Sequence, residues 1–521
     1  MPDRADLVIW LPTAINLAFM FALGACVGSF VHVVAWRMPQ GLSIVTPPSR
    51  CPTCGFRLPW NHNLPVLGYL FLRGRCGACG IAIPRRYVLA EVAMGALFAA
   101  IYAVLYLPEG GSFWFPVGEG WWHAQGWRSV PALLVVLWAV GSLVAMTMCD
   151  WATYLIPVAI PTLASVVAFA GWPIAAALAE GRVDAFPLEP VGWRVGVAAI
   201  GMLAGLGVSR VLLAAGVLPR SFADYDQYLE SPDDTFADYP HARREMLKEI
   251  AFVGPGVLLG ALAWLAAGHV TEPASLHPSV AALLSVAVGF VVGGAMVWVL
   301  RIVATLLMDT EAMGLGDVHL MAAVGAAFGW KVAGVGFLVA PFVGLAWWLV
   351  LLVRSAPWRV PYGPSLAVGS IAAFFLEPGL RSVVSGALAG MGRAAEQARA
   401  EPGGTLVLAV MLAGVSAGVA RAARSGRGVL AAASIALMVV AVVSWILAAG
   451  SRPVAGALVA AFLVASSIAG SVLVRPGLED GAGPRTAVAR ILRMLAFTVV
   501  LAGAFLLVAR PGGGPGGTPG G

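Results

Sequence analysis

Two aspartates stand at the ends of apolar segments in a chain that carries few charges. Asp317 follows Gly314 and Gly316 and precedes an apolar run, whereas Asp150 ends the apolar run 131–149. A carboxylate at membrane depth is costly, and it therefore marks a candidate functional site. Two carboxyl groups held close together share a proton, so one can activate water while the other protonates a leaving group. The pair is a candidate for amide hydrolysis.

The two glycines extend this prediction. Backbone without side chains lets an extended substrate approach an acid closely, so Gly314 and Gly316 are candidate substrate-approach residues. Two other interpretations of the acids stay open from the spacing alone. Either aspartate could cap a helix at the membrane interface, where it would satisfy free N–H groups. Intramembrane acids also serve as ion or proton relays, which makes a membrane transporter the alternative to a peptidase.

The composition requires a membrane protein. Of the 521 residues, 60% are hydrophobic and 11% are charged, and the mean hydropathy is +0.87. A soluble protein cannot cover its surface with this composition. We therefore expect an all-α polytopic membrane protein, a helical bundle embedded in the lipid bilayer. The net charge of +6 comes almost wholly from arginine, whose placement sets topology in such a protein, so we expect no nucleic-acid partner.

Basic residues define the expected topology. A first span over residues 11–36 leads into residues 37–86, which hold seven arginines and no acid. Short loops rich in arginine stay in the cytoplasm, so residues 37–86 are expected there. Counting the later spans from this loop places Asp150 and Asp317 at the same, cytoplasmic face. This coincidence supports a joint role for the two acids.

The rest of the chain divides by its polarity. A transmembrane peptidase core is expected over residues 87–377, interrupted by a polar insert at 219–249 with eight acids and four bases. Such a charged insert is typical of a cytoplasmic loop. Residues 318–330 form a short apolar segment, either a half-span or a tilted helix. A C-terminal extension of about four further spans is expected over 393–510, followed by a disordered Gly/Pro tail at 511–521.

Four of the six cysteines form two CxxC pairs in the arginine-rich segment, at Cys51, Cys54, Cys76 and Cys79. Two such pairs can supply the four thiolates of a tetrahedral structural Zn²⁺ site, and their spacing is close to that of zinc ribbons. Disulfides are disfavoured in the cytoplasm, where this segment is expected, and this favours the Zn²⁺ site. A redox dithiol is the other interpretation. We predict that residues 37–86 form a small loop domain that Zn²⁺ stabilises.

Further motifs accompany the acids and the cysteine tetrad along residues 12–377. In chain order they are Gly28-Ser29-Phe30-Val31-His32, Trp60-Asn61-His62-Asn63-Leu64-Pro65, Leu72-Arg73-Gly74-Arg75-Cys76, Arg86-Tyr87, Glu91, Ile156-Pro157, Gly314-Leu315-Gly316-Asp317-Val318 and Pro361-Tyr362-Gly363-Pro364. The GxGD motif alone is a weak signal. Together with the tetrad, the second aspartate and the PYGP turn it is specific, and the chain resembles the type IV prepilin peptidases. These are bifunctional leader peptidases and N-methyltransferases of the bacterial inner membrane.

The resemblance implies a function. Asp150 and Asp317 would be the catalytic pair of a GxGD-type intramembrane aspartyl peptidase, and the cysteine tetrad would bind Zn²⁺. The substrates would be prepilins or pseudopilins, cut at the cytoplasmic face after a short basic leader. The new N-terminus would then be methylated with S-adenosylmethionine. The protein would be a multi-pass protein of the bacterial inner (cytoplasmic) membrane, serving type IV pili or type II secretion.

Four positions depart from the family pattern. His32 stands where Asn is usual, Gly68 where Ser is frequent, His319 replaces a Lys, and Val158 replaces an acid. None of these changes removes a candidate catalytic acid or a cysteine, so the expectation of peptidase activity stands. The histidine two residues after the GxGD acid could tune the protonation of the pair or face the lipid headgroups.

Overall fold

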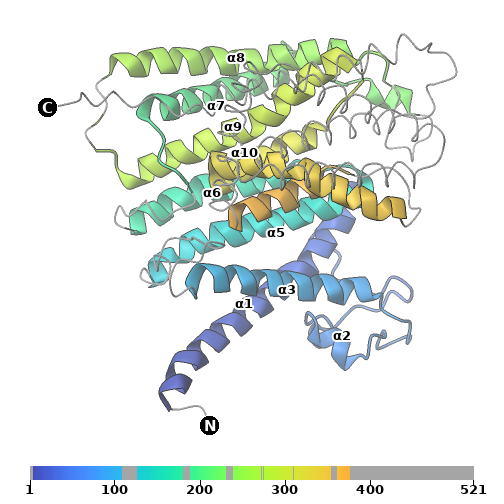
Figure 1. The fold of residues 1–521 in the computed structure, drawn as a ribbon. Coiled ribbons are helices and arrows are strands. Elements are labelled where there is room, and N and C mark those ends of the chain that lie inside the picture. The colour runs from blue at the N-terminus through green and yellow to red at the C-terminus, as the bar shows by residue number, and fades with distance from the viewer. Residues whose placement is uncertain are drawn as a thin grey trace, which may run out of the picture. The chain divides into compact units, whose positions relative to one another are not determined.

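The computed structural model shows an all-helical protein over the described residues (Figure 1). These are residues 4–107, 126–179, 188–229, 239–270, 273, 275–308, 310–353 and 361–375. Within these ranges eight helices are long and apolar enough to cross a membrane, and no β-strand occurs. The prediction of an all-α, multi-pass membrane protein is confirmed. The predicted C-terminal extension (393–510) and tail (511–521) lie outside the described residues.

The long helices follow one another along the chain. They are α1 (Arg4–Arg37), α3 (Arg85–Tyr106), α5 (Val130–Thr153), α6 (Ala159–Leu178), α7 (Trp193–Ala214), α8 (Ala242–His269), α9 (Pro278–Met308) and α10 (Leu315–Val353). Many leucine, valine and isoleucine side chains on these helices are exposed in the isolated protein. Such apolar outer faces are stable only against lipid, which agrees with the composition.

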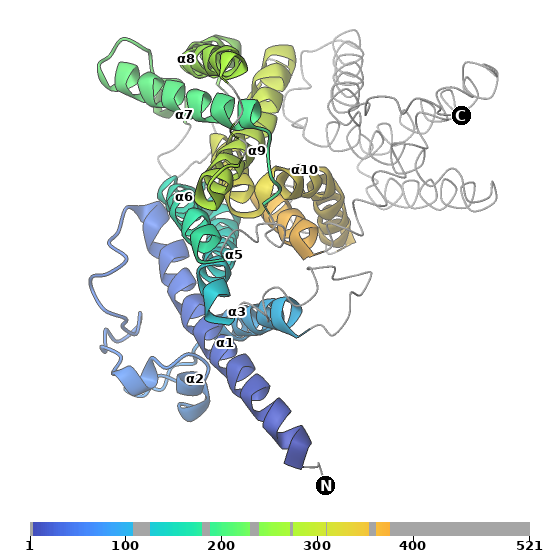
Figure 2. The same cartoon turned by 90° about the vertical axis from the view of Figure 1, so that its left-hand side faces the viewer.

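The helices pack mainly with their sequence neighbours. The chain divides into two compact units, of which the first comprises Met1–Ala340 and Val360–Gly379. Inside it α1 packs on α3 and α5 (Figure 2), α6 packs on α5 and α9, and α7 packs on α8. The most buried spans are α5 and α10. The two candidate acids therefore come from the interior of the bundle.

The start of α10 is fixed against α9 by glycines. A Cβ on Gly289 would collide with the carbonyl oxygen of Gly325, and a Cβ on Gly325 would collide with that of Gly289. Small residues at such a crossing let two backbones approach closely in a membrane. Residues 318–330, predicted as a half-span or tilted helix, form the first part of α10, which is broken at Gly329 (φ 85°, ψ 164°).

The described part of the insert (residues 219–249) is packed on the bundle. Its last residues, 242–249, are the first turns of α8, and a 3₁₀ turn, η5, covers Tyr225–Tyr228. The Phe222 N–H donates to Oε2 of Glu245 at 2.6 Å, and the Tyr239 hydroxyl donates to Oδ1 of Asp224 at 2.7 Å. The insert, which the sequence predicts to be a polar loop, is therefore ordered by specific hydrogen bonds.

Candidate functional site

The structure brings the two candidate acids to one end of the bundle. Asp150 lies in the last turn of α5 and Asp317 in the first turn of α10, and they are only 7% and 8% exposed. Tyr154 ends α5 in the left-handed conformation, and its N–H donates to the Asp150 carbonyl at 2.8 Å. The Asp317 N–H donates to the Gly314 carbonyl at 3.2 Å. Each acid is therefore placed by a helix end.

Ile156 connects the surroundings of the two acids. A Cβ on Gly316, the residue before Asp317, would lie 3.0 Å from the Cβ of Ile156. A Cβ on Gly363, which contacts Asp150, would lie 3.3 Å from the Cδ1 of the same isoleucine. The short segment after α5 therefore packs against both the GxGD motif and the PYGP turn.

Gly363 holds the Asp150 carboxyl directly. Its N–H donates to Oδ2 of Asp150 at 3.0 Å. Asp317 lies within electrostatic range of Asp150 and of Arg301, and the phenol of Tyr362 lies within range of Asp317. Two buried carboxyl groups within electrostatic range of each other can divide the roles of general base and general acid.

The two candidate substrate-approach glycines differ in their surroundings. A Cβ on Gly314 would meet only Oδ2 of Asp317 at 3.6 Å and the N atom of Gly316 at 3.9 Å. The space beside Gly314 is therefore open, as close approach of a substrate would require. Gly316 instead packs tightly against Ile156, so helix packing alone explains its lack of a side chain.

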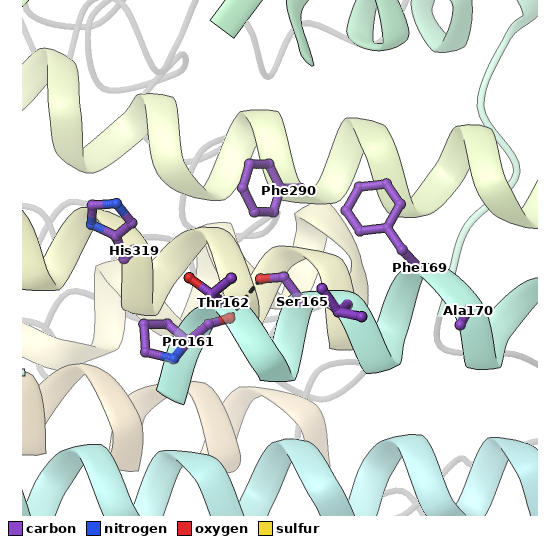
Figure 3. A pocket seen from close by; sticks show the side chains of 8 residues that line it. Pro161, Thr162, Ser165, Phe169, Ala170, Phe290 and His319 are labelled. Carbon is purple, nitrogen blue, oxygen red and sulfur yellow. Dashed lines mark hydrogen bonds between the residues drawn. The ribbon is translucent and has the colours of Figure 1, made fainter. Parts of the chain in front are cut away.

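A groove of about 520 Å³ lies beside the start of α10 (Figure 3). It is lined by Pro161, Thr162, Ser165, Val166, Phe169 and Ala170 of α6, Phe290 of α9 and His319 of α10. The Nδ1 atom of His319 lies 2.8 Å from the Leu315 carbonyl of its own helix. The histidine that departs from the family pattern thus borders a mostly apolar groove two residues after Asp317.

The four cysteines of the tetrad also come together. All four Sγ atoms lie within 4.8 Å of one another, with 3.9 Å between Cys51 and Cys79 and 4.0 Å between Cys54 and Cys76. Tetrahedral zinc with Zn–S bonds of about 2.3 Å needs sulfurs about 3.8 Å apart. The thiol geometry therefore fits a Zn²⁺ ion.

Backbone N–H groups also favour the thiolate at two of the four cysteines. Hydrogen bonds from the N–H groups of Cys54 and Thr53 lower the pKa of the Cys51 thiol, and the N–H groups of Cys79 and Ala78 lower that of Cys76. A lowered pKa favours the thiolate, which is the form that binds metal.

Two contacts tie the loop domain to the bundle. Arg37 at the end of α1 donates to the carbonyls of Ser43 and Pro47 at 3.0 and 2.7 Å. Glu91 of α3 accepts the Val66 N–H at 2.7 Å, and Val66 has a φ of 61°, which is unusual for a β-branched residue. The motif residue Glu91 therefore holds a strained turn of the loop.

Sequence reasoning missed two residues next to the acids. Gly363 belongs to the PYGP motif, but the sequence does not indicate its hydrogen bond to Asp150, which lies 213 positions away in the chain. Arg301 is buried in α9 and paired with Glu249 and Glu311. An arginine inside an apolar run needs a partner, and this rule could have indicated it from the sequence.

Comparisons with known proteins find similar peptidases. Residues 22–105 match the family model described as Bacterial Peptidase A24 N-terminal domain. The chain is 33% identical over 257 residues to the prepilin leader peptidase/N-methyltransferase of Myxococcus xanthus, which covers 48% of this chain and 64% of that relative. Over these residues the chain is similar to a bacterial peptidase domain and to a prepilin leader peptidase/N-methyltransferase.

Other relatives carry the same name. The match to the protein of Klebsiella pneumoniae is 44% identical over 87 residues, 16% of this chain and 38% of that relative. The match to the protein of Pseudomonas putida is 24% identical over 391 residues, 70% of this chain and 92% of that relative. The matches thus span less than two-thirds of the Myxococcus and Klebsiella relatives. No solved structure matches the chain.

Proposed function

We propose that the protein is a membrane aspartyl endopeptidase that removes the basic leader of type IV prepilins or pseudopilins. Cleavage would take place at the cytoplasmic face of the bacterial inner membrane. The observation that carries the proposal is the burial of Asp150 and Asp317 at one end of the bundle, within electrostatic range of each other. The substrate class is supported by the name of the relatives, prepilin leader peptidase/N-methyltransferase.

The two acids would divide the work of amide hydrolysis. The Gly363 N–H bonded to Oδ2 of Asp150 stabilises a negative carboxylate, so we assign Asp150 as the general base that takes a proton from water. Asp317 would be the general acid that protonates the carbonyl oxygen or the leaving amine. The open backbone at Gly314 would let the extended leader junction lie beside Asp317.

The loop domain would have a structural role that is separate from catalysis by the two acids. Cys51, Cys54, Cys76 and Cys79 would hold a structural Zn²⁺, whose role is to stabilise a segment without a core of its own. N-methylation of the new N-terminus would follow cleavage, because the relatives' names join the two activities. S-adenosylmethionine, when bound, would supply the methyl group.

Processing of a co-expressed prepilin tests the peptidase assignment. Asp150→Asn and Asp317→Asn keep the size of each side chain but cannot exchange a proton, and each is expected to abolish leader removal at an unchanged level of membrane protein. Asp226→Asn changes an exposed acid of the insert and is expected to leave processing intact. Full processing by either of the first two variants would refute the assignment.

A further inference from the structure

Arg301 is a buried cation with an unusually complete set of partners. It is 1% exposed, and its Nε lies 3.1 and 3.2 Å from the two carboxylate oxygens of Glu249. Its Nη2 lies 3.0 Å from Oε1 of Glu249, and its Nη1 donates to Oε1 of Glu311 at 2.7 Å and to the Met313 carbonyl. All three guanidinium nitrogens are therefore engaged, as burial of a charge requires.

Two of these partners lie on the connector between α9 and α10. Met313 immediately precedes Gly314 and lies four residues before Asp317. Thr305, one turn after Arg301 on α9, is also buried, and its Oγ1 accepts the Ala312 N–H at 3.2 Å. Two side chains of α9 thus bind backbone groups of two adjacent connector residues, Ala312 and Met313. The backbone that leads into the GxGD motif is therefore held at the Ala312 N–H and at the Met313 carbonyl.

The other partners link Arg301 to the insert. Glu249, in the part of the insert that forms α8, accepts the Trp298 Nε1–H at 2.7 Å, and Trp298 lies one turn before Arg301. Phe222 lies at the start of the insert, and the Arg301 guanidinium lies 5.4 Å from the centre of its ring. Cation–π contact of this kind strengthens when the cation is shielded from water. Arg301 therefore joins the insert, α8, α9 and the connector.

We propose that Arg301 is a positioning residue for the peptidase site. It holds the connector so that the Asp317 carboxyl faces Asp150, and the insert is the outer anchor that keeps its guanidinium in place. The inference rests on the proposed function. A lysine at this position would keep the charge, but a single ammonium group cannot reproduce the planar fork that reaches Glu249, Glu311 and Met313 together.

The test compares purified Arg301→Lys with the wild type on a synthetic prepilin peptide in detergent. We expect kcat to fall about tenfold or more while KM stays within about twofold, because a small misplacement of a reacting group lowers the rate without changing the contacts that bind substrate. Arg194→Lys is the matched control, since Arg194 lies over the Trp264 ring and away from the connector. Equal kcat values for Arg301→Lys and the wild type would overturn the inference.

A second variant keeps the inference testable if Arg301→Lys does not fold. Thr305→Val preserves shape and the ion pairs but removes the acceptor for the Ala312 N–H. We expect faster hydrogen exchange at the Ala312 amide, together with a threefold to tenfold fall in kcat, about the effect of one lost hydrogen bond. Faster exchange with an unchanged kcat would show that the connector's position does not limit the reaction, and would overturn the inference.

Failure of the inference is distinguishable from failure of the proposed function. If Asp150→Asn and Asp317→Asn cleave the peptide as the wild type does, the proposed function is wrong. If those variants are inactive while Arg301→Lys and Thr305→Val are fully active, only the positioning role is wrong.

Discussion

The backbone N–H of Gly363 donates a hydrogen bond of 3.0 Å to Oδ2 of Asp150. This contact joins the PYGP turn to the last turn of α5. The Tyr362 carbonyl accepts the N–H groups of Ser365 and Leu366 at 3.0 and 3.1 Å, so the turn is fixed at the start of the short helix Gly363–Phe375. One oxygen of Asp150 is therefore held by rigid backbone, which suits a residue that must keep one orientation.

Gly363→Ala should disable the site without unfolding the bundle. Its Cβ would lie 2.5 Å from Oδ2 of Asp150 and 3.2 Å from Cγ, so the carboxyl must move. We expect kcat for leader cleavage to fall roughly 100-fold, the effect of moving a reacting group by about 1 Å. Gly334→Ala, where a Cβ meets nothing within 4 Å, is the control for added volume in the same unit. Comparable activity of the two variants would contradict the role of Gly363.

Alanine at the two GxGD glycines should produce different defects. At Gly316 the new Cβ lies 3.0 Å from the Cβ of Ile156. We therefore expect the free energy of unfolding to fall by about 1–3 kcal/mol, which is typical of overpacking. At Gly314 the new Cβ has ordinary contact distances, so stability should hold while KM for the prepilin peptide rises. Thermal unfolding and steady-state kinetics on both variants measure this split, and an unchanged KM for Gly314→Ala would remove the substrate-approach role.

Metal content should depend on the tetrad. We expect about one zinc ion per chain in the purified protein, and a marked loss in Cys54→Ser and Cys79→Ser, because structural zinc needs all four thiolates. Without the metal, residues 50–83 should become sensitive to proteases. Cys26→Ser, which changes an exposed cysteine of α1, should keep the metal. Elemental analysis and limited proteolysis measure both effects, and full zinc content in either tetrad variant would contradict the site.

The acids and the cysteines could be predicted because their chemistry is rare in an apolar chain. The spacing of Cys51, Cys54, Cys76 and Cys79 limits the thiolates to one compact site. Counting spans placed Asp150 and Asp317 at the same face, since each apolar run reverses the direction of the chain. Cysteine spacing and the order of the spans are properties of the sequence itself, so they can be used without knowing how the helices pack.

The positioning contacts could not be predicted in the same way. The hydrogen bond between Gly363 and Asp150 depends on how α5 and the PYGP turn meet in space. The insert shows the same limit, because its charges indicate a cytoplasmic loop but do not indicate that Glu245 and Glu249 are buried. In the structure both are buried, and each is paired with a cation, Lys248 or Arg301. Glu249 and Arg301 lie 52 positions apart, and no periodic pattern in the sequence indicates such a pair.

Acid should loosen the insert through Asp224. The hydrogen bond from the Tyr239 hydroxyl lowers the pKa of Asp224 below its ordinary value. The unfolded insert then binds a proton more readily than the folded one, so the stabilisation is present above the ordinary carboxyl pKa and is lost as the pH falls through the lowered one.

Amide protection factors of residues 219–229, corrected for intrinsic exchange, measure this effect. They should fall below about pH 4 in the wild type, near the ordinary pKa of an aspartate. Asp224→Asn should show a flatter pH dependence, whereas Asp226→Asn, an exposed neighbour, should behave as the wild type does. Identical pH profiles for Asp224→Asn and the wild type would contradict the prediction.

The central claim is that Asp150 and Asp317 act as one catalytic unit. It is tested most directly by single-turnover cleavage of a prepilin peptide by purified Asp150→Asn, Asp317→Asn and the double variant. Residues that act as a unit lose activity non-additively, so each single variant should lower the rate by at least about 1,000-fold and the double variant should be no slower than either. A rate near that of the wild type in either single variant, or losses that multiply in the double variant, would contradict the account.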